Sequence, residues 1–273
     1  MLPSYILSLR EGLEAALIIG IVLGALRQIR RTELSPAVWL GAGSAALVSV
    51  AAAILLAQLG LSLEGDAEKI FEGITMLAAA GILTWMIFWM NRQARHIKSD
   101  LEAGVHSASQ AGKRGLFALA FFAIVREGIE LALFLTASVF ATDASQTLTG
   151  ALLGLGTSAL LGWSLFATTV KLDLRRFFQV TGILLILFAA GLVAHGIHEF
   201  NEIGWIPTVI EHVWDVNPLL DEDSITGQIL KALFGYNGNP SLTEMLAYAG
   251  YFVAIFFGLR LANRKSVAVG QQA

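Results

Sequence analysis

The charged residues with the clearest chemical potential lie in two copies of one motif. Residues 10–14 read Arg-Glu-Gly-Leu-Glu, and residues 126–130 read Arg-Glu-Gly-Ile-Glu. The two glutamates of each copy are three residues apart, so a helix places both carboxylates on one face, where they can share one cation. The arginine and the second glutamate are four residues apart, a spacing that permits an ion pair when no metal is bound. Carboxylate oxygens favour a hard cation over Cu(I) or an anion. The candidate metal ligands are Glu11, Glu14, Glu127 and Glu130, and the candidate ion-pair or gating residues are Arg10 and Arg126.

Both motifs lie inside long apolar stretches, which must form the elements that position them. The 273 residues are 56% hydrophobic and 14% charged, too apolar for an ordinary soluble enzyme. A bilayer core about 30 Å thick needs roughly 20 apolar helical residues. Stretches of that kind predict seven transmembrane helices at about 4–26, 36–60, 71–90, 116–140, 147–170, 178–199 and 243–260. A charge deep in such a span costs at least ~2.5 kcal/mol on insertion scales, so the motif charges need partners, a bound ion or water.

The motif copies indicate a duplication. Each copy opens a group of three predicted spans, and because three is odd, the second group is expected to be inverted relative to the first. The predicted fold is therefore an all-α, polytopic membrane protein with two inverted three-helix repeats and one extra helix. The predicted organisation is one transmembrane domain, 1–273, with a first repeat 1–91, a second repeat 115–200, an outer segment 201–242 and a seventh helix 243–262. Gly12, Gly128 and the pair Gly20 and Gly24 are expected to let helix backbones approach closely.

The distribution of basic residues predicts the orientation. Most of the 18 Lys and Arg residues fall in four groups, at 27–31, 92–114, 171–176 and 260–265. Alternating spans bring all four groups to one side, which the positive-inside rule makes cytoplasmic, with the C-terminus there and the N-terminus outside. The opposite segments are acidic, which either concentrates cations there or reflects solvated loop charge.

Composition also excludes several classes of function and site. The net charge of −3 gives no basic surface for nucleic acid. The sequence has no cysteine, so thiolate metal sites, iron–sulfur clusters and catalytic thiols are excluded. No Gly-x-x-x-x-Gly-Lys loop for ATP occurs, and no organic cofactor or catalytic residue is expected.

A second set of candidates lies toward the outer ends of two spans. Four residues at the outer end of the sixth span share one helix flank and are either ligands for a divalent ion at the entrance or interfacial hydrogen-bonding groups: His195, His198, Glu199 and Glu202. Glu72 is either an entrance ligand or a carboxylate stabilised at a helix N-terminus. The candidate ligands in this set are Glu72, His198 and Glu199.

At these residues the sequence resembles the oxidase-dependent iron transporter family, which includes the fungal high-affinity iron permeases and the bacterial EfeU-type permeases. The resemblance rests on the Arg-Glu-x-x-Glu motif in both halves, on Phe-Glu-Gly at 71–73, on the segment 83–90 and on Phe-Gly-Tyr at 234–236. It covers essentially the whole chain. It implies a seven-helix permease in the cell inner (cytoplasmic) membrane that imports iron, as Fe3+ or Fe2+, with the four motif glutamates in the iron path.

The resemblance also implies partners besides the lipid bilayer. Related bacterial systems include a periplasmic cupredoxin-like protein and a haem peroxidase, so an iron-oxidising or iron-binding partner is expected. Three alternatives stay open at the level of sequence. They are an importer of another divalent metal such as Mn or Pb, an intramembrane metallohydrolase built on His195, His198 and Glu199, and a sensor or structural protein whose motifs only lock helices together.

Overall fold

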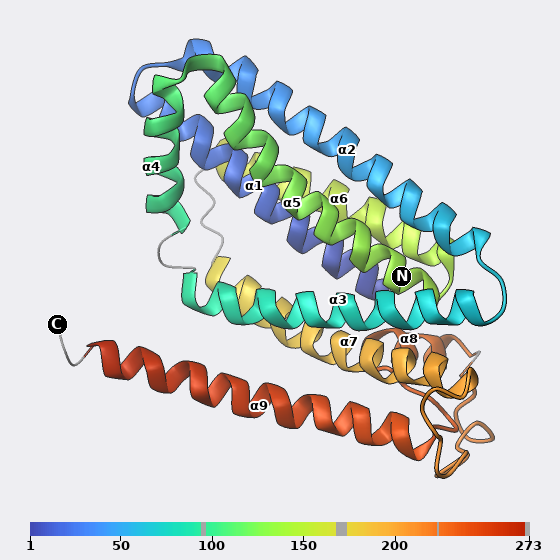
Figure 1. Cartoon of the computed structure of the whole chain (residues 1–273). Helices are drawn as coiled ribbons and strands as arrows, with labels where there is room; N and C mark the ends of the chain where they lie inside the picture. Colours follow the sequence, from blue (N-terminus) through green and yellow to red (C-terminus); the bar gives the residue numbers. More distant parts are fainter. Residues whose placement is uncertain (94–96, 168–173, 223, 271–273) are drawn as a thin grey trace. The chain divides into compact units, whose positions relative to one another are not determined.

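The computed structural model describes residues 1–93, 97–167, 174–222 and 224–270, whose regular secondary structure is helical with no strand. Figure 1 shows the helices along the chain. They are α1 (Leu2–Gln28), α2 (Ser35–Ser62), α3 (Asp66–Gln93), α4 (Ile97–Gln110), α5 (Gly112–Ala141), α6 (Ala144–Ala167), α7 (Leu174–Glu202), α8 (Ile225–Phe234) and α9 (Leu242–Gly270), with a single 3₁₀ turn at Thr32–Leu34. The all-α prediction is confirmed.

Several of these helices are long and apolar enough to cross a membrane. Among the described residues there are five such segments, in α2 together with the 3₁₀ turn before it, α3, α6, α7 and α9. The motif helices α1 and α5 have 27 and 30 residues, and at 1.5 Å per residue they reach about 40 and 45 Å. Their charges distinguish them from the five apolar segments. The chain is thus a multi-pass membrane protein, while seven spans and their orientation stay predictions. Two of the basic groups behind that orientation include segments, 94–96 and 168–173, outside the described residues.

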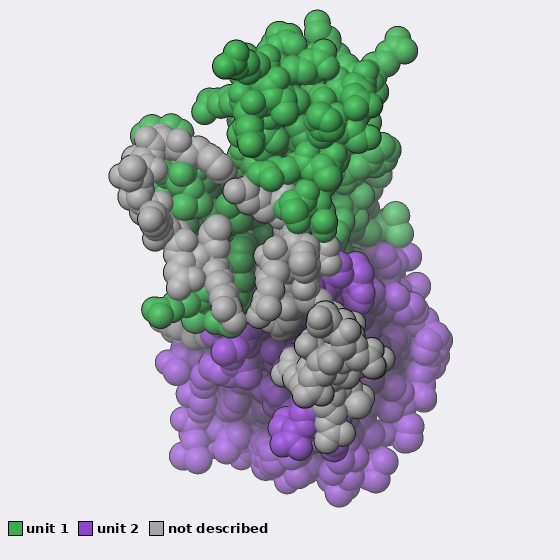
Figure 2. Space-filling model, turned by 90° about the vertical axis from the view of Figure 1, so that its left-hand side faces the viewer, with its two compact units in different colours: residues 1–62, 93–139, 143–181 green, residues 63–92, 140–142, 182–273 purple. Residues whose placement is uncertain are grey.

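The chain divides into two compact units, coloured separately in Figure 2. Unit 1 comprises residues 1–62, 93–139 and 143–181, and unit 2 comprises residues 63–92, 140–142 and 182–273. The predicted repeats 1–91 and 115–200 each contribute their first two long helices to unit 1 and most of their third to unit 2. The boundaries of the compact units therefore do not coincide with those of the predicted repeats, and the duplication stays a prediction.

Small residues bring the long helices of unit 1 together. Along α6, Gly150, Gly154, Ser158 and Gly162 recur every fourth residue and face α1: a Cβ on any of these glycines would touch α1 atoms. Gly41 of α2 likewise faces the backbone of Phe117 in α5. Without a strong hydrophobic driving force in lipid, such close approach gives the van der Waals contact that associates helices. Figure 1 shows α1, α2, α5 and α6 running alongside one another.

The N-terminus of α6 has a local cap. Asp143 Oδ1 accepts hydrogen bonds from the backbone N–H groups of Ser145 and Gln146 at 2.9 and 3.1 Å, and also from the Ser145 hydroxyl. Such an N-cap satisfies amides that the helix leaves unpaired. The Ser145 hydroxyl and the Gln146 amide together lower the pKa of Asp143.

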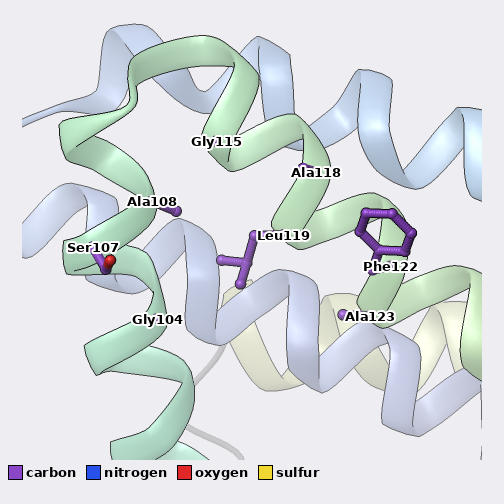
Figure 3. A pocket seen from close by; sticks show the side chains of 8 residues that line it. All are labelled: Gly104, Ser107, Ala108, Gly115, Ala118, Leu119, Phe122 and Ala123. Carbon is purple, nitrogen blue, oxygen red and sulfur yellow. The ribbon is translucent and has the colours of Figure 1, made fainter.

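Beside the start of α5, the short helix α4 leaves a shallow hollow, shown in Figure 3. Its lining consists of small and apolar residues with one hydroxyl, that of Ser107. No charged side chain lines it, so this hollow offers nothing to hold a cation.

Unit 2 is built on α3, α7, α8 and α9. Gly73 of α3 lies against the Gly196 carbonyl and the Phe200 ring of α7, and the hydroxyls of Thr84 in α3 and Tyr251 in α9 are 2.8 Å apart. Helix α8 ends at Gly235, whose φ of 65° is in the left-handed region that favours glycine. Gly235 also lies directly against Gly191 of α7, where a side chain would clash. The outer segment 201–242 therefore contains a helix anchored on α7.

Candidate metal site

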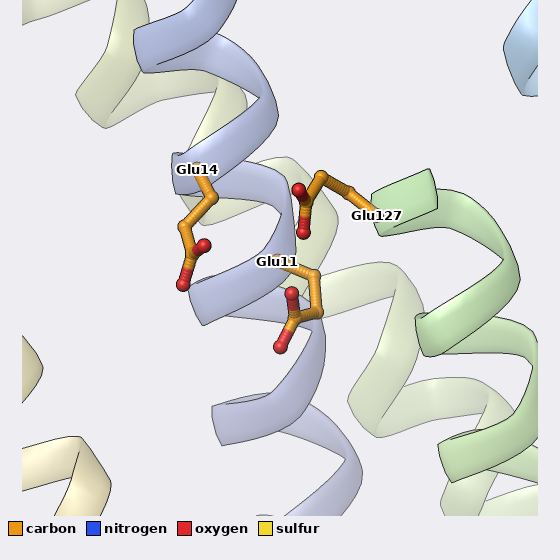
Figure 4. A group of neighbouring side chains, drawn as sticks. All are labelled: Glu11, Glu14 and Glu127. Carbon is orange, nitrogen blue, oxygen red and sulfur yellow. The ribbon is translucent and has the colours of Figure 1, made fainter. Parts of the chain in front are cut away.

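Three of the predicted glutamates meet inside unit 1. Helix α1 contributes Glu11 and Glu14, and α5 contributes Glu127; one carboxylate oxygen from each lies within 4.8 Å of the other two. Figure 4 shows Glu127 reaching from α5 toward the two side chains of α1. Among the described residues, this is the one group of three or more acidic or histidine side chains close enough to hold a metal ion. Glu11 is 1% exposed and Glu127 is 7% exposed.

A buried arginine supplies the counter-charge in the first motif. Arg10 Nη1 lies 2.7 Å from Glu11 Oε1, and Nη2 lies 3.0 Å from Glu14 Oε1. The Arg10 side chain is 2% exposed, and its guanidinium lies over the Phe178 ring at 6.0 Å. Two carboxylates and a guanidinium out of water require this mutual compensation, because an isolated buried charge costs several kcal/mol. Arg10 therefore offsets one of the two carboxylate charges of Glu11 and Glu14 and leaves one negative charge for a cation to balance.

The second motif is arranged differently. Arg126 Nε lies 2.9 Å from Glu130 Oε1, and the Arg126 side chain is 38% exposed. Glu130 is buried but is not a member of the three-carboxylate group. Its charge still acts on Glu11 and Glu14, so it lies beside the group. Two motifs of nearly the same sequence thus have unequal surroundings.

Several carboxylate oxygens in this region are buried without a hydrogen-bond partner. They are Glu11 Oε2, Glu127 Oε2 and Glu130 Oε2. Leaving a buried acceptor unsatisfied costs roughly 1–3 kcal/mol, and more when the group is charged. In a native protein such atoms require an explanation, for which a bound ion or ordered water is the usual one. A hard cation fits this set because every available donor atom is a carboxylate oxygen.

The motif glycines set the helix positions that make this arrangement possible. A Cβ on Gly12 would collide with Ser158 of α6, and a Cβ on Gly128 would collide with Ser49 of α2. Both serines turn their hydroxyls back onto their own helices, donating to Leu155 O and Ala45 O at 2.8 Å. The close approach predicted for Gly12 and Gly128 is confirmed. The prediction for Gly24 is wrong in the part of the chain that the structure describes, where nothing lies within 4 Å of a Cβ at this position.

The other predicted ligands lie in unit 2. His198 of α7 has both ring nitrogens engaged: Nδ1 is 3.0 Å from Glu244 Oε1, and Nε2 is 3.2 Å from Glu202 Oε1. Glu202 also pairs with Lys69 of α3. Glu72 and Glu199 interact electrostatically, but neither joins a metal-binding group in the part of the chain that the structure describes. The role of these three residues as ligands stays a prediction.

His195 does not add to a metal group either. Its Nδ1 lies 3.0 Å from the carbonyl of Gly191, one turn earlier in α7. The metallohydrolase alternative needs His195, His198 and Glu199 around one ion, and the described side chains form no such group.

Glu244 is the residue of this region that our sequence reasoning missed. It is 4% exposed and accepts hydrogen bonds from the Ser241 hydroxyl at 2.8 Å and from Asn237 Nδ2 at 2.7 Å, besides contacting His198. Ser241 precedes α9, and its Oγ accepts from the Glu244 amide at 3.3 Å. Ser-x-x-Glu before an apolar run is the sequence pattern of a capping box, so a signal was present.

Comparison with known proteins gives a match over almost the whole sequence. The model of the iron permease FTR1 family matches residues 1–269. A protein named "Putative inactive ferrous iron permease EfeU" from Escherichia coli (strain K12) is 32% identical, with all of both chains covered. "Ferrous iron permease EfeU" from Escherichia coli (strain UTI89 / UPEC) is 34% identical, with 97% of both chains covered. The protein of that name from Yersinia pestis is 33% identical, covering 93% of this chain and 91% of its own. No solved structure matches.

Proposed function

This chain belongs to the iron permease FTR1 family, and from this premise we propose that it carries iron ions across the membrane through the carboxylates of its two Arg-Glu-Gly-x-Glu motifs. The family makes the chain a membrane transporter rather than an enzyme. The ligands in our proposal are Glu11, Glu14 and Glu127, with Glu130 beside them. The observation that carries the proposal is the convergence of three carboxylate oxygens within 4.8 Å of one another on largely buried side chains.

Charge favours Fe2+ as the transported species. When ionised, the four motif carboxylates and two guanidiniums leave two net negative charges, which one Fe2+ balances. An incoming ion takes the place of the Arg10 guanidinium at Glu11 and Glu14; without metal, Arg10 balances only part of their charge. The relatives' name, ferrous iron permease, agrees with this valence. In this mechanism Arg10 is the gating residue of the first motif and Arg126 that of the second.

The proposal includes seven spans in two inverted repeats, of which α1 and α5 are the charged members. Two matched contacts support it: the motif glycine of α1 packs on a serine of α6, and the motif glycine of α5 packs on a serine of α2. Each motif helix thus packs on the second long helix of the other repeat, as a pseudo-twofold axis requires. The proposal places the protein in the cytoplasmic membrane with its N-terminus outside. There an iron-oxidising or iron-binding partner, cupredoxin-like or a haem peroxidase, would meet the entrance.

Uptake of iron-55 into proteoliposomes tests this function. Fe2+ is held by ascorbate without oxygen and Fe3+ by citrate, and the variants are Glu11→Gln, Glu127→Gln and, as a matched control, the exposed Glu33→Gln. We expect Fe2+ uptake by the wild type and Glu33→Gln, and at least about tenfold less in the two site variants, equivalent to ~1.4 kcal/mol. Uptake that is unchanged in well-folded Glu11→Gln and Glu127→Gln would place the iron path elsewhere.

Competition by Mn2+ and Pb2+ in the same vesicles tests the closest alternative. Carboxylates discriminate weakly among divalent ions, so some inhibition is expected from both. If iron is the substrate, Fe2+ must be transported more efficiently than Mn2+ and Pb2+. Faster transport of Mn2+ or Pb2+ would mean that the same site carries a different metal ion.

A further inference from the structure

One buried hydroxyl of unit 1 differs from the others in its hydrogen bonding. A serine or threonine inside a helix can donate to a carbonyl three or four residues earlier. Four buried hydroxyls of unit 1 do so at 2.8 or 2.9 Å, those of Ser4, Ser49, Thr136 and Ser158. Ser8 of α1 is fully buried, and its Oγ is the one buried hydroxyl among the described residues without a partner. Because an unsatisfied buried polar group costs free energy, this oxygen requires an explanation.

Ser8 lies one helical turn before Glu11. Residues three apart are neighbours on a helix surface, with Cβ atoms about 5–6 Å from each other. Helix side chains tilt toward the N-terminus, so the Glu11 carboxylate leans toward the turn that contains Ser8. Figure 4 shows the Glu11 and Glu14 side chains leaning in the direction that runs from Glu14 to Glu11. Glu11 Oε2 is also buried without a hydrogen-bond partner, so α1 has two unused oxygens one turn apart.

Helix α6 holds this part of α1 in place. A Cβ on Gly154 of α6 would lie 2.9 Å from Ser8 Cβ, and a Cβ on Gly12 would collide with Ser158 of α6. At 3.6 residues per turn, Ser8 projects from α1 between the directions of Gly12 and Glu11. Its hydroxyl is thus at the border between the α6 contact and the carboxylates, in a position fixed by packing.

The corresponding position of the second motif carries no oxygen. The motifs begin at residues 10 and 126, so Ser8 corresponds to Ile124. Ile124 is buried in an apolar cluster with Ala42 and Ala45 of α2. Figure 1 shows α1 and α5 running in opposite directions, so Ser8 and Ile124 lie on opposite sides of the three-carboxylate group. An ion that approaches from the N-terminal side of α1 can therefore meet a hydroxyl, whereas the other side is apolar.

We propose that Ser8 Oγ is an additional ligand of the transported ion, which it binds together with Glu11 on the side of the group nearest the N-terminus of α1. The proposal rests on the proposed function and adds a neutral donor to its ligands. Hard divalent cations take six or more oxygen ligands, so three carboxylates leave positions for a hydroxyl. Because the hydroxyl is neutral, it replaces a water of hydration and leaves the charge balance with Fe2+ unchanged.

Equilibrium dialysis of purified protein against iron-55, as Fe2+ held by ascorbate without oxygen, tests the hydroxyl directly. The variants are Ser8→Ala and, as a matched control, Ser4→Ala, which removes a buried hydroxyl of the same helix that already donates to Met1 O. We expect Ser8→Ala to raise the Kd for Fe2+ about tenfold, equivalent to ~1.4 kcal/mol, and Ser4→Ala to leave it unchanged. Equal Kd values for wild type and Ser8→Ala would overturn the proposal.

A sulfur substitution gives a spectroscopic readout that a purely structural serine would not produce. The chain has no native cysteine, so Ser8→Cys places a single thiol beside the carboxylates. Thiolate sulfur favours softer metal ions, and its bond to Cd2+ has an ultraviolet charge-transfer band. We expect Cd2+ to produce this band in Ser8→Cys, not in Ser4→Cys, and to bind at least about tenfold more weakly in Ser8→Cys/Glu11→Gln. No band in folded Ser8→Cys, or unchanged affinity without Glu11, would contradict shared coordination.

These measurements separate the inference from the proposed function. If wild type binds and transports Fe2+ and Ser8→Ala matches it, the proposed function stands and Ser8 is not a ligand. If wild type neither binds nor transports iron, the proposed function fails and the role of Ser8 with it. Size-exclusion chromatography identifies misfolded protein, and Ser8→Gly, which removes the hydroxyl and cannot clash with α6, is the substitute for Ser8→Ala.

Discussion

Gly12→Ala measures how closely the first motif helix must approach its neighbour. A Cβ at this position would lie 2.9 Å from Ser158 Cβ, 3.3 Å from Leu155 Cδ2 and closer still to Ser158 Oγ. These atoms belong to α6, which packs along α1, so the alanine cannot be accommodated by turning a flexible surface side chain. The two helices must separate, or Ser158 must leave its rotamer and its hydrogen bond to Leu155 O.

The expected change in the free energy of unfolding is the difference between two opposing effects. Overpacking a tight contact costs about 1–3 kcal/mol, while alanine gains up to about 1 kcal/mol over glycine in helix propensity. Gly12→Ala is therefore expected to lower the free energy of unfolding by up to about 2 kcal/mol. Gly24→Ala, in the same helix but with nothing within 4 Å of its Cβ, keeps the propensity gain alone and is expected to be stabilising. The two variants should differ in sign.

Reversible denaturation in mixed micelles, followed by circular dichroism, provides the assay. The double variant Gly12→Ala/Ser158→Gly removes the colliding side chain, so a double-mutant cycle should recover at least about 1 kcal/mol. Gly128→Ala with Ser49→Gly repeats the test in the second motif. If Gly12→Ala is as stable as Gly24→Ala, or if Ser158→Gly gives no recovery, close approach at the motif glycine does not position the carboxylates as argued.

Three further predictions concern charge. Arg10→Gln leaves the buried Glu11 and the mostly buried Glu14 without their partner and should destabilise the protein by about 3–5 kcal/mol. Arg126 is more exposed, so Arg126→Gln should cost clearly less, and equal losses in the denaturation midpoint would contradict the asymmetry. Saturation with Fe2+ at a hundred times its Kd should raise stability by about 2.7 kcal/mol, measured as a shift of the midpoint, and Glu127→Gln should abolish the shift. The lowered pKa of Asp143 contributes stability that is present above its ordinary value of 3.8 and lost as pH falls through the lowered pKa. As pH falls below about 4, wild type should thus lose more stability than Asp143→Asn, and identical profiles would show that the cap does not depend on the charge.

Local pattern was enough to predict the helical fold and the helix face on which the motif residues lie. The spacing of Glu11 and Glu14 within one helix predicts that they share a face. The long apolar runs predict helices long enough to cross a membrane. The same reasoning failed at Gly24, where a small residue was expected to face a neighbouring helix and instead has open space. Residue size indicates where close packing is possible, but the position of the neighbouring helix decides where it occurs.

Partners from distant segments were beyond the sequence reasoning. His198 was a candidate ligand because of its neighbours along α7, yet its Nδ1 is engaged by Glu244, at the start of α9. The capping-box pattern at Ser241 could have placed Glu244 at a helix start. It could not have shown that this carboxylate also reaches a histidine of another helix, because that contact depends on how α7 and α9 pack within unit 2.

The asymmetry between the motifs could not be predicted from sequence for a stronger reason. Two nearly identical segments carry the same local information, so no reading of residues 10–17 and 126–133 can assign Glu127 rather than Glu130 to the three-carboxylate group. That choice depends on the packing of the helices around the two motifs, which lies outside these segments. Sequence can therefore name the set of carboxylates available to an ion, while only a structure shows which three are assembled at one time.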